Sequence, residues 1–215
     1  MASQAERELR DAVVSRLRVL LPEARIIHEL KVADGKNRAD LAAVTPDKIV
    51  LVELKSRRDK LDRLQGQMRE FYRHSHCAIA AIDEKHLERK LHDKSRWGPG
   101  GVWVSPSNRL NRVQVASKYI WSYPPLPIHD IMRAPTDDWE LPPFREMPDA
   151  YALLNLLWAA EQKEVMQALT IPAKGARNRD GQNERIRLYA SGKQITEQVC
   201  AQLRQRPFAE ADPPM

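Results

Sequence analysis

The run from Arg38 to Lys55, RADLAAVTPDKIVLVELK, constrains the fold of this chain more than any other stretch. Residues 48–55 form a β-branched apolar run that is too short for a helix and follows the turn signal Thr45-Pro46-Asp47, so they predict a strand. Both of its alternating faces are apolar until the charges begin, which is typical of a central strand covered on both sides. Residues 38–44 predict a preceding strand, and the short turn between the two runs predicts an antiparallel hairpin.

This hairpin places two acidic side chains where they can meet. Asp40 is near the start of the first strand and Glu53 is near the end of the second, so we expect their carboxylates to be neighbours. Such carboxylates repel each other unless a cation joins them, and oxygen ligands favour Mg²⁺ or Mn²⁺. Lys55 would orient an attacking water or offset charge on a phosphate in the transition state. The alternative is a strand that runs into solvent with a surface ion pair, because this loose spacing is common by chance.

Two predicted helices add one polar side chain each. Residues 5–21 predict an amphipathic helix with Glu6 on its inward stripe, although the helix dipole also favours an acid in the first turn. Residues 59–73 predict a second helix, whose apolar stripe carries Gln67. An inward amide would bind a metal-bound water or a phosphate; the alternative is a glutamine at the margin of the stripe. Further strands are expected at 25–32, which carries Glu29, and at 78–82.

The order helix, three strands, helix, strand, with these side chains, resembles the PD-(D/E)xK nuclease superfamily and a group of small bacterial and phage proteins within it. The resemblance covers residues 5–92 and rests on Glu6-Arg7-Glu8-Leu9-Arg10, His28-Glu29-Leu30, Arg38-Ala39-Asp40, Glu53-Leu54-Lys55-Ser56 and the run from Asp59 to Gln67. It implies that Asp40 and Glu53 hold the metal, with Glu29 as a further ligand. It also implies that Lys55 serves the nucleophilic water and that Gln67 and Glu6 support the site. Ala39 stands where related nucleases usually present a proline or a similar residue.

The charge balance favours a protein that handles polyanions. The chain has 35 lysines and arginines against 29 acids, a net charge of +6 and a pI near 9.4. From Lys174 to Arg206, eight basic residues accompany three acidic ones. We expect DNA contacts from Arg38, Lys174, Arg177, Arg179, Arg185 and Arg187. The alternative is a solvated basic segment with no dedicated ligand.

Cysteine usage and hydropathy indicate the compartment. Cys77 and Cys200 are too few and too distant for a disulfide framework, which favours a reducing environment. The start of the chain lacks an apolar segment, and no apolar run approaches the length of a membrane span, so we expect a soluble cytoplasmic protein without membrane contact. His74, His76 and Cys77 lack a second ligand pair at zinc spacing, so we expect no structural zinc.

The chain is expected to divide into three parts: a nuclease-like domain at 1–123, a proline-rich connector at 124–148, and a helical C-terminal subdomain with a basic tail at 149–215. Residues 83–96 predict a charged helix, and residues 102–104 and 119–121 predict strands. Helices are expected from 149 through Val165, near 182–189 and near 193–206.

These patterns together predict an α/β protein with a restriction-endonuclease-like core: a helix, a three-stranded mostly antiparallel meander, a helix and a strand. A C-terminal helical appendage follows. The expected activity is hydrolysis of DNA phosphodiesters with Mg²⁺ or Mn²⁺. One alternative is a non-catalytic DNA- or protein-binding module, such as a phage or bacterial accessory or inhibitor protein. Another is a nuclease subunit that is active only in a larger assembly, with a protein partner on the C-terminal subdomain.

Overall fold

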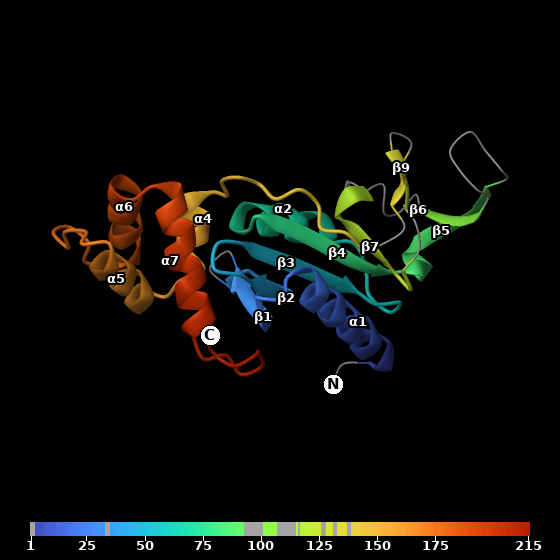
Figure 1. Ribbon diagram of the computed structural model, residues 1–215, viewed down its shortest axis with the longest axis horizontal. Helices are drawn as coiled ribbons and strands as arrows, with labels where there is room; N and C mark the ends of the chain where they lie inside the picture. The colour runs from blue at the N-terminus through green and yellow to red at the C-terminus, as the bar shows by residue number, and fades with distance from the viewer. Residues whose placement is uncertain are drawn as a thin grey trace. The chain divides into compact units, whose positions relative to one another are not determined.

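The structure is a computed structural model, which describes residues 3–32, 35–92, 101–106, 115, 117–125, 128–130, 133–136 and 139–215 (Figure 1). Its helices are α1 (Gln4–Leu20), α2 (Leu64–His74), α4 (Ala150–Leu154), α5 (Ala159–Ala168), α6 (Arg179–Tyr189) and α7 (Gly192–Gln205), with 3₁₀ turns η2 (Glu84–His86) and η3 (Ser117–Tyr119). Its strands are β1 (Arg25–Val32), β2 (Asn37–Val44), β3 (Ile49–Lys55), β4 (Cys77–Asp83), β5 (Leu87–His92), β6 (Gly101–Pro106), β7 (Ile120–Tyr123), β8 (Ile128–Asp130) and β9 (Arg133–Thr136). The expected α/β class is thus confirmed as a mixed fold with an N-terminal helix, a mixed sheet and a C-terminal helical region.

The strands form two sheets. The five-stranded sheet has the order β1-β2-β3-β4-β7, and the four-stranded sheet has the order β5-β6-β8-β9. In the first sheet β1 and β2 are antiparallel, whereas β4 and β7 are parallel. All seven residues of β3 and all seven of β4 are buried, as the continuous apolar runs predict for central strands.

The direction of β3 relative to β4 follows from contacts at their ends. At the start, Ile49 N donates to His76 Nδ1 at 3.1 Å and His76 N donates to Ile49 O at 2.9 Å. At the finish, His86 Nε2 lies 3.0 Å from Ser56 O. Strands that begin together and end together run the same way, so β3 and β4 are parallel, with α2 as the crossover between them.

The chain divides into two compact units. Unit 1 consists of Met1–Leu20, Val52–Met68 and Ile79–Pro142, and unit 2 of Leu21–Leu51, Arg69–Ala78 and Pro143–Met215. The three-part division expected from the sequence stays a prediction.

In unit 1, α1 buries Leu9, Val13 and Leu17 on one stripe, as its helical periodicity predicts. The rings of Trp121 and Trp139 stack at 5.2 Å, and Arg16 Nε donates to Trp139 O at 2.8 Å. These contacts attach α1 to the segment that follows β7.

In unit 2, α4, α5, α6 and α7 form a helical group (Figure 1). Helix α7 buries Ile195, Val199 and Leu203, the stripe expected from the sequence. The Arg206 guanidinium at its C-terminus forms a buried ion pair with both carboxylate oxygens of Glu161 on α5. The helical group is therefore held by a polar contact as well as by apolar packing.

Two sequence expectations need correction. The charged helix predicted at 83–96 is wrong, because η2 and strand β5 occupy residues 84–92; residues 93–96 lie outside the described residues. The helix predicted from 149 through Val165 is two helices, since Trp158 is extended and its amide donates to Glu161 Oε2 at 2.7 Å at the start of α5. Strands β8 and β9 lie within the segment predicted as a proline-rich connector at 124–148, and the connector stays a prediction.

Within the part of the chain that the structure describes, none of the helices has the length and apolarity that a membrane crossing requires.

Candidate functional site

Glu53, Lys55 and Gln67 form a polar cluster in unit 1, which we call the Glu53 cluster. Lys55 Nζ and Gln67 Nε2 each donate to Glu53 Oε1 at 2.6 Å, and Lys55 Nζ also donates to Gln67 Oε1 at 3.2 Å. Glu53 is 3% exposed and Lys55 is 6% exposed. A charged pair is rarely buried to this extent, and here the two charges neutralise each other and share the amide as a third partner.

The sequence pattern explains how these residues meet. Glu53 and Lys55 are two apart in β3, so their side chains leave the strand on the same face. Gln67 lies on the apolar stripe of α2, three residues after buried Leu64. Gln67 hydrogen-bonds to Glu53 and Lys55, whereas Gln65 is exposed; the predicted role of Gln67 at a metal-bound water or a phosphate stays a prediction.

Polar contacts surround the carboxyl ends of β3 and β4 in unit 1. The ring of buried His86 lies against Ser56 O, and Lys85 Nζ donates to Arg57 O at 2.9 Å. Arg57 Nε lies 3.8 Å from Asp83 Oδ2, at the last residue of β4. Carboxyl ends of adjacent parallel strands are where α/β sheets usually bind ligands.

The loop that follows Lys55 is basic, which the sequence reasoning missed. Its exposed cations are Arg57, Arg58, Lys60 and Arg63, and its exposed acids are Asp59 and Asp62. Asp59 Oδ2 accepts hydrogen bonds from Ser56 N at 2.8 Å and from Ser56 Oγ at 2.7 Å, so this acid shapes the turn. The sequence signal was the run Arg57-Arg58, which follows Ser56 just beyond the end of β3.

The other predicted metal ligands lie in unit 2. Glu29 has a left-handed backbone, with φ at 61°, and its side chain pairs with Arg38. The register pairs His28 with Leu41 and Leu30 with Ala39, which places Glu29 and half-buried Asp40 at facing positions of β1 and β2. Arg38 is exposed but is engaged with Glu29, so its predicted DNA contact would compete with that pair.

Glu6, predicted to support the site, pairs within its own helix. Its carboxylate lies 3.6 Å from Arg10 one turn later, and its amide donates to Ser3 Oγ at 3.3 Å. These are the contacts of an acid in a first helical turn, the alternative that the sequence left open.

Within unit 1, Glu53 Oε1 does not fit as a ligand of a divalent cation. Among the residues that the structure describes, no three His, Cys, Asp or Glu side chains gather as a metal-binding group. At Glu53, Oε1 accepts from both Lys55 and Gln67, so a cation at this oxygen would face an ammonium 2.6 Å away. The metal roles of Asp40, Glu53 and Glu29 stay predictions.

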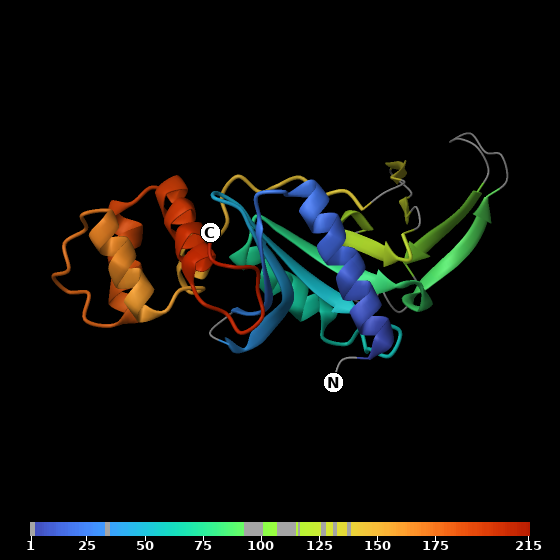
Figure 2. The ribbon, with the colours of Figure 1, turned by 60° about the horizontal axis from the view of Figure 1, so that its bottom comes forward.

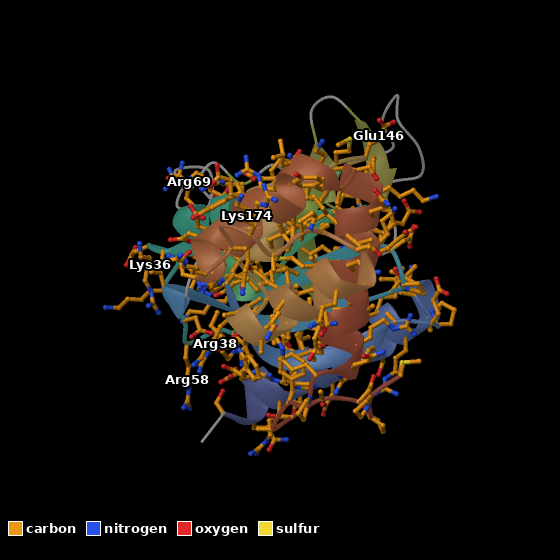
Figure 3. All side chains as sticks on the ribbon, turned by 90° about the vertical axis from the view of Figure 1, so that its left-hand side faces the viewer. Lys36, Arg38, Arg58, Arg69, Glu146 and Lys174 are labelled. Atoms are coloured by element: carbon orange, nitrogen blue, oxygen red, sulfur yellow. The ribbon has the colours of Figure 1, made fainter. Side chains whose placement is uncertain are left out.

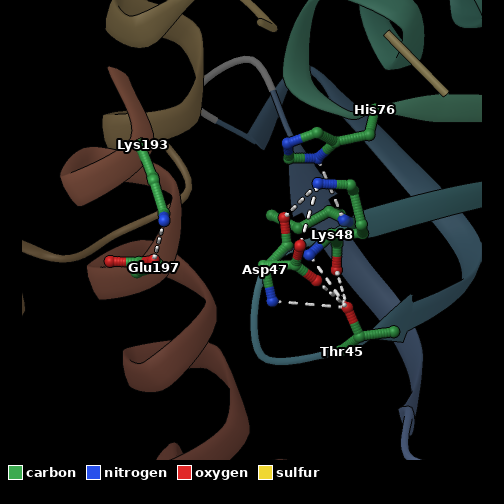
Figure 4. A network of polar contacts seen from close by, with 7 residues as sticks. Thr45, Asp47, Lys48, His76, Lys193 and Glu197 are labelled. Carbon is green, nitrogen blue, oxygen red and sulfur yellow. Dashed lines mark hydrogen bonds and ion pairs between the residues drawn. The ribbon is translucent and has the colours of Figure 1, made fainter. Parts of the chain in front are cut away.

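A second polar cluster, in unit 2, surrounds the turn between β2 and β3 (Figure 4). Thr45 Oγ1 accepts from Lys48 N at 2.9 Å and contacts Asp47 Oδ1 at 3.2 Å, while Lys48 Nζ pairs with Asp47 Oδ2 at 2.9 Å. Burial, followed by the charge of Lys48, lowers the pKa of His76 from 6.5 to about 4. His76 is therefore neutral at pH 7, which leaves Nδ1 free of a proton to accept from the backbone of β3. This cluster stabilises the turn.

Most predicted DNA-contacting residues of the helical group are accessible. Lys174, Arg177 and Arg187 are exposed, and Figure 3 labels Lys174. Arg185 is half-buried with its guanidinium 4.8 Å from the Tyr189 ring centroid. Arg179 is half-buried and donates to Asn155 O, so this predicted contact residue has a structural bond instead.

Comparison with known proteins corrects the resemblance drawn from the sequence. The family model of bacteriophage P4 protein cII matches residues 1–118, more than half of the chain. No curated protein and no solved structure matches. The match covers the stretch that carries the PD-(D/E)xK motifs, so the assignment to that superfamily is wrong. Its motif elements are short and loosely spaced, and such patterns recur in unrelated sequences. The chain belongs to the bacteriophage P4 protein cII family.

Proposed function

We propose that this protein is a non-catalytic accessory protein that binds DNA through the basic surface of its helical group. The observation that carries the proposal is the charge of residues 172–193, which contain six lysines and arginines against two acids. Lys174 and Arg177 lie in the loop between α5 and α6, and Arg187 lies on α6, all three exposed.

The form of these side chains suits phosphate contact. Lysine and arginine in a loop reach a phosphate backbone without a fixed register, and each contact releases counterions. The Arg187 guanidinium lies 5.6 Å from the Tyr151 ring centroid, which holds it at the surface without an acidic partner in that contact. Sequence-independent binding to duplex DNA is the expected outcome.

The test is fluorescence anisotropy with a labelled DNA duplex over a range of salt concentrations. Affinity decreases with salt, so the slope of log affinity against log salt is negative. In the triple variant Lys174→Ala/Arg177→Ala/Arg187→Ala, the magnitude of this slope should decrease by about 3, since each lost phosphate contact removes about 0.9. The matched control is Arg18→Ala/Lys31→Ala/Lys163→Ala, which removes three exposed cations from other elements. Equal slopes for the two variants would show that only the net charge of the protein matters, and this result would reject the proposed surface.

The second candidate function is metal-dependent phosphodiester hydrolysis. It is favoured by the burial of Lys55 against Glu53, because buried charged pairs are concentrated at functional sites. The arrangement around Glu53 Oε1 does not fit a cation, so we place it second. Plasmid, linear, branched and single-stranded DNA with Mg²⁺, Mn²⁺ or EDTA would test it. Metal-dependent cleavage that falls by about 10² to 10³ in Lys55→Ala would replace the non-catalytic proposal.

A further inference from the structure

The outer edge of β1 is covered by residues 207–212, which we call the C-terminal strap. His28 N donates to Glu210 O at 3.0 Å, Asp212 N donates to Ile26 O at 2.9 Å, and Ile27 forms an antiparallel bridge with Ala211. Figure 2 shows this segment running back from α7 along β1. Because β1 is the first strand in the sheet order, the strap satisfies backbone groups that a sheet edge would otherwise leave open.

Side chains give the strap a defined register. Asp212 Oδ2 accepts from Ile26 N at 2.9 Å, and Asp212 O accepts from Arg25 Nε at 2.9 Å. The Phe208 ring centroid lies 5.4 Å from the Arg25 guanidinium carbon and 5.3 Å from that of Arg206. The edge thus recognises an aromatic residue, then an extended segment with a small residue and an acid.

The edge of β1 that contacts the strap is anchored by a buried arginine. Arg25 is 1% exposed, and its Nη1 donates to the carbonyls of Leu203, Arg204 and Arg206 at the end of α7. In the strap, Pro207, Ala209 and Glu210 are exposed, and two backbone hydrogen bonds join it to β1. The strap is held by these two bonds, by the side-chain contacts of Phe208 and Asp212, and by Glu210, whose carboxylate lies 3.4 Å from His28 Nδ1. A sheet edge covered by a short extended segment is also where sheets accept a peptide from another protein.

We infer that the outer edge of β1 is a peptide-binding site, which the strap occupies until an extended acidic segment of a partner protein displaces it. The partner segment carries an aromatic residue at the position of Phe208, a small residue at that of Ala211 and an acid at that of Asp212. The amide of Ile26, which donates to the Asp212 carboxylate, selects the acid, whereas Arg25 Nε binds the backbone carbonyl at the same position. This site is separate from the basic surface proposed to bind DNA.

The probe is a fluorescent peptide with the sequence of residues 207–215, added to the full-length chain. The tethered strap competes at a millimolar effective concentration, so the peptide should bind wild type weakly. Asp212→Ala in the chain removes the bond to Ile26 N, and peptide affinity should rise about tenfold. Pro213→Ala, at an exposed position one residue further along, is the matched control and should bind like wild type. A second peptide, in which alanine replaces the aspartate that corresponds to Asp212, should bind more weakly than the peptide with the natural sequence.

Hydrogen exchange on wild type provides a second readout that needs no variant. Excess peptide should speed exchange of the Asp212 amide, while the His28 amide stays protected because the peptide replaces the strap. Equal binding of the acidic and alanine peptides, or no change at the Asp212 amide, would overturn the inference. Dimerisation of Asp212→Ala in size-exclusion chromatography would also overturn it, because the occupant would then be a second copy of the chain.

Discussion

Replacing Lys55 with methionine should lower the free energy of unfolding by about 3 to 5 kcal/mol, the usual cost of leaving a buried charge without its partner. Glu53 is 3% exposed, so water cannot take over from the lost ammonium. The remaining donor at Oε1 is Gln67, and a neutral amide does not offset the carboxylate charge. Methionine retains the volume of the lysine stem, which limits the contribution of a cavity.

The double variant Glu53→Leu/Lys55→Met separates the charge from the packing. When both charges are replaced by apolar groups of similar volume, most of the lost stability should return, because neither side chain has to be desolvated. Gln67 is half-buried, so water can reach its amide in this variant. The double variant should therefore be more stable than Lys55→Met alone.

Urea denaturation followed by circular dichroism measures these free energies. The control is Lys48→Met, directly before the same strand, where the ammonium pairs with Asp47 at a largely exposed position. That pair should contribute about 0 to 1 kcal/mol. If Lys55→Met costs no more than Lys48→Met, the Glu53 carboxylate is solvated, and the reasoning about the Glu53 cluster is refuted.

Three further predictions concern other positions. The lowered pKa of His76 means that the unfolded chain binds more protons between pH 6.5 and about 4, so stability should fall by about 3 kcal/mol as the pH drops through that window. His76→Asn should remove this dependence in urea titrations at several pH values. Gly175→Ala should destabilise by about 1 kcal/mol because φ is +88°, whereas Gly66→Ala, helical and with open space around its Cβ, should stabilise by about 0.5 to 1 kcal/mol in thermal melts. Glu161→Ala should cost about 3 to 5 kcal/mol in urea denaturation, because it strands the buried Arg206 guanidinium; a loss below 1 kcal/mol would show that water reaches that guanidinium.

Local patterns in the sequence were enough to predict the elements whose side chains follow one clear period. The stripe of α1 and the continuous apolar runs of β3 and β4 each match one type of element, because burial on one face or on both leaves a distinct spacing. The same reasoning brought Gln67 toward Glu53, since a position on a helical stripe faces whatever covers that helix. Residues within a few positions of each other carry this information without help from the rest of the chain.

Where the spacing fits two elements, only tertiary contacts decided. Leu87 and Leu91 are four apart, which suits one face of a helix and one face of a strand alike, and the antiparallel pairing of β5 with β6 selected the strand. The break between α4 and α5 is held in part by Arg206, which pairs with Glu161 from a distant part of the sequence. The strap on β1 has no periodicity at all.

The place of the C-terminal strap depends on Arg25, a residue whose burial no local pattern predicts. The sequence by itself determined which segments would be helix or strand where one face is consistently apolar. The tertiary structure alone decided that Glu161 and Arg206 would be buried together, because the fold, and not their spacing in the chain, brings these two side chains within reach.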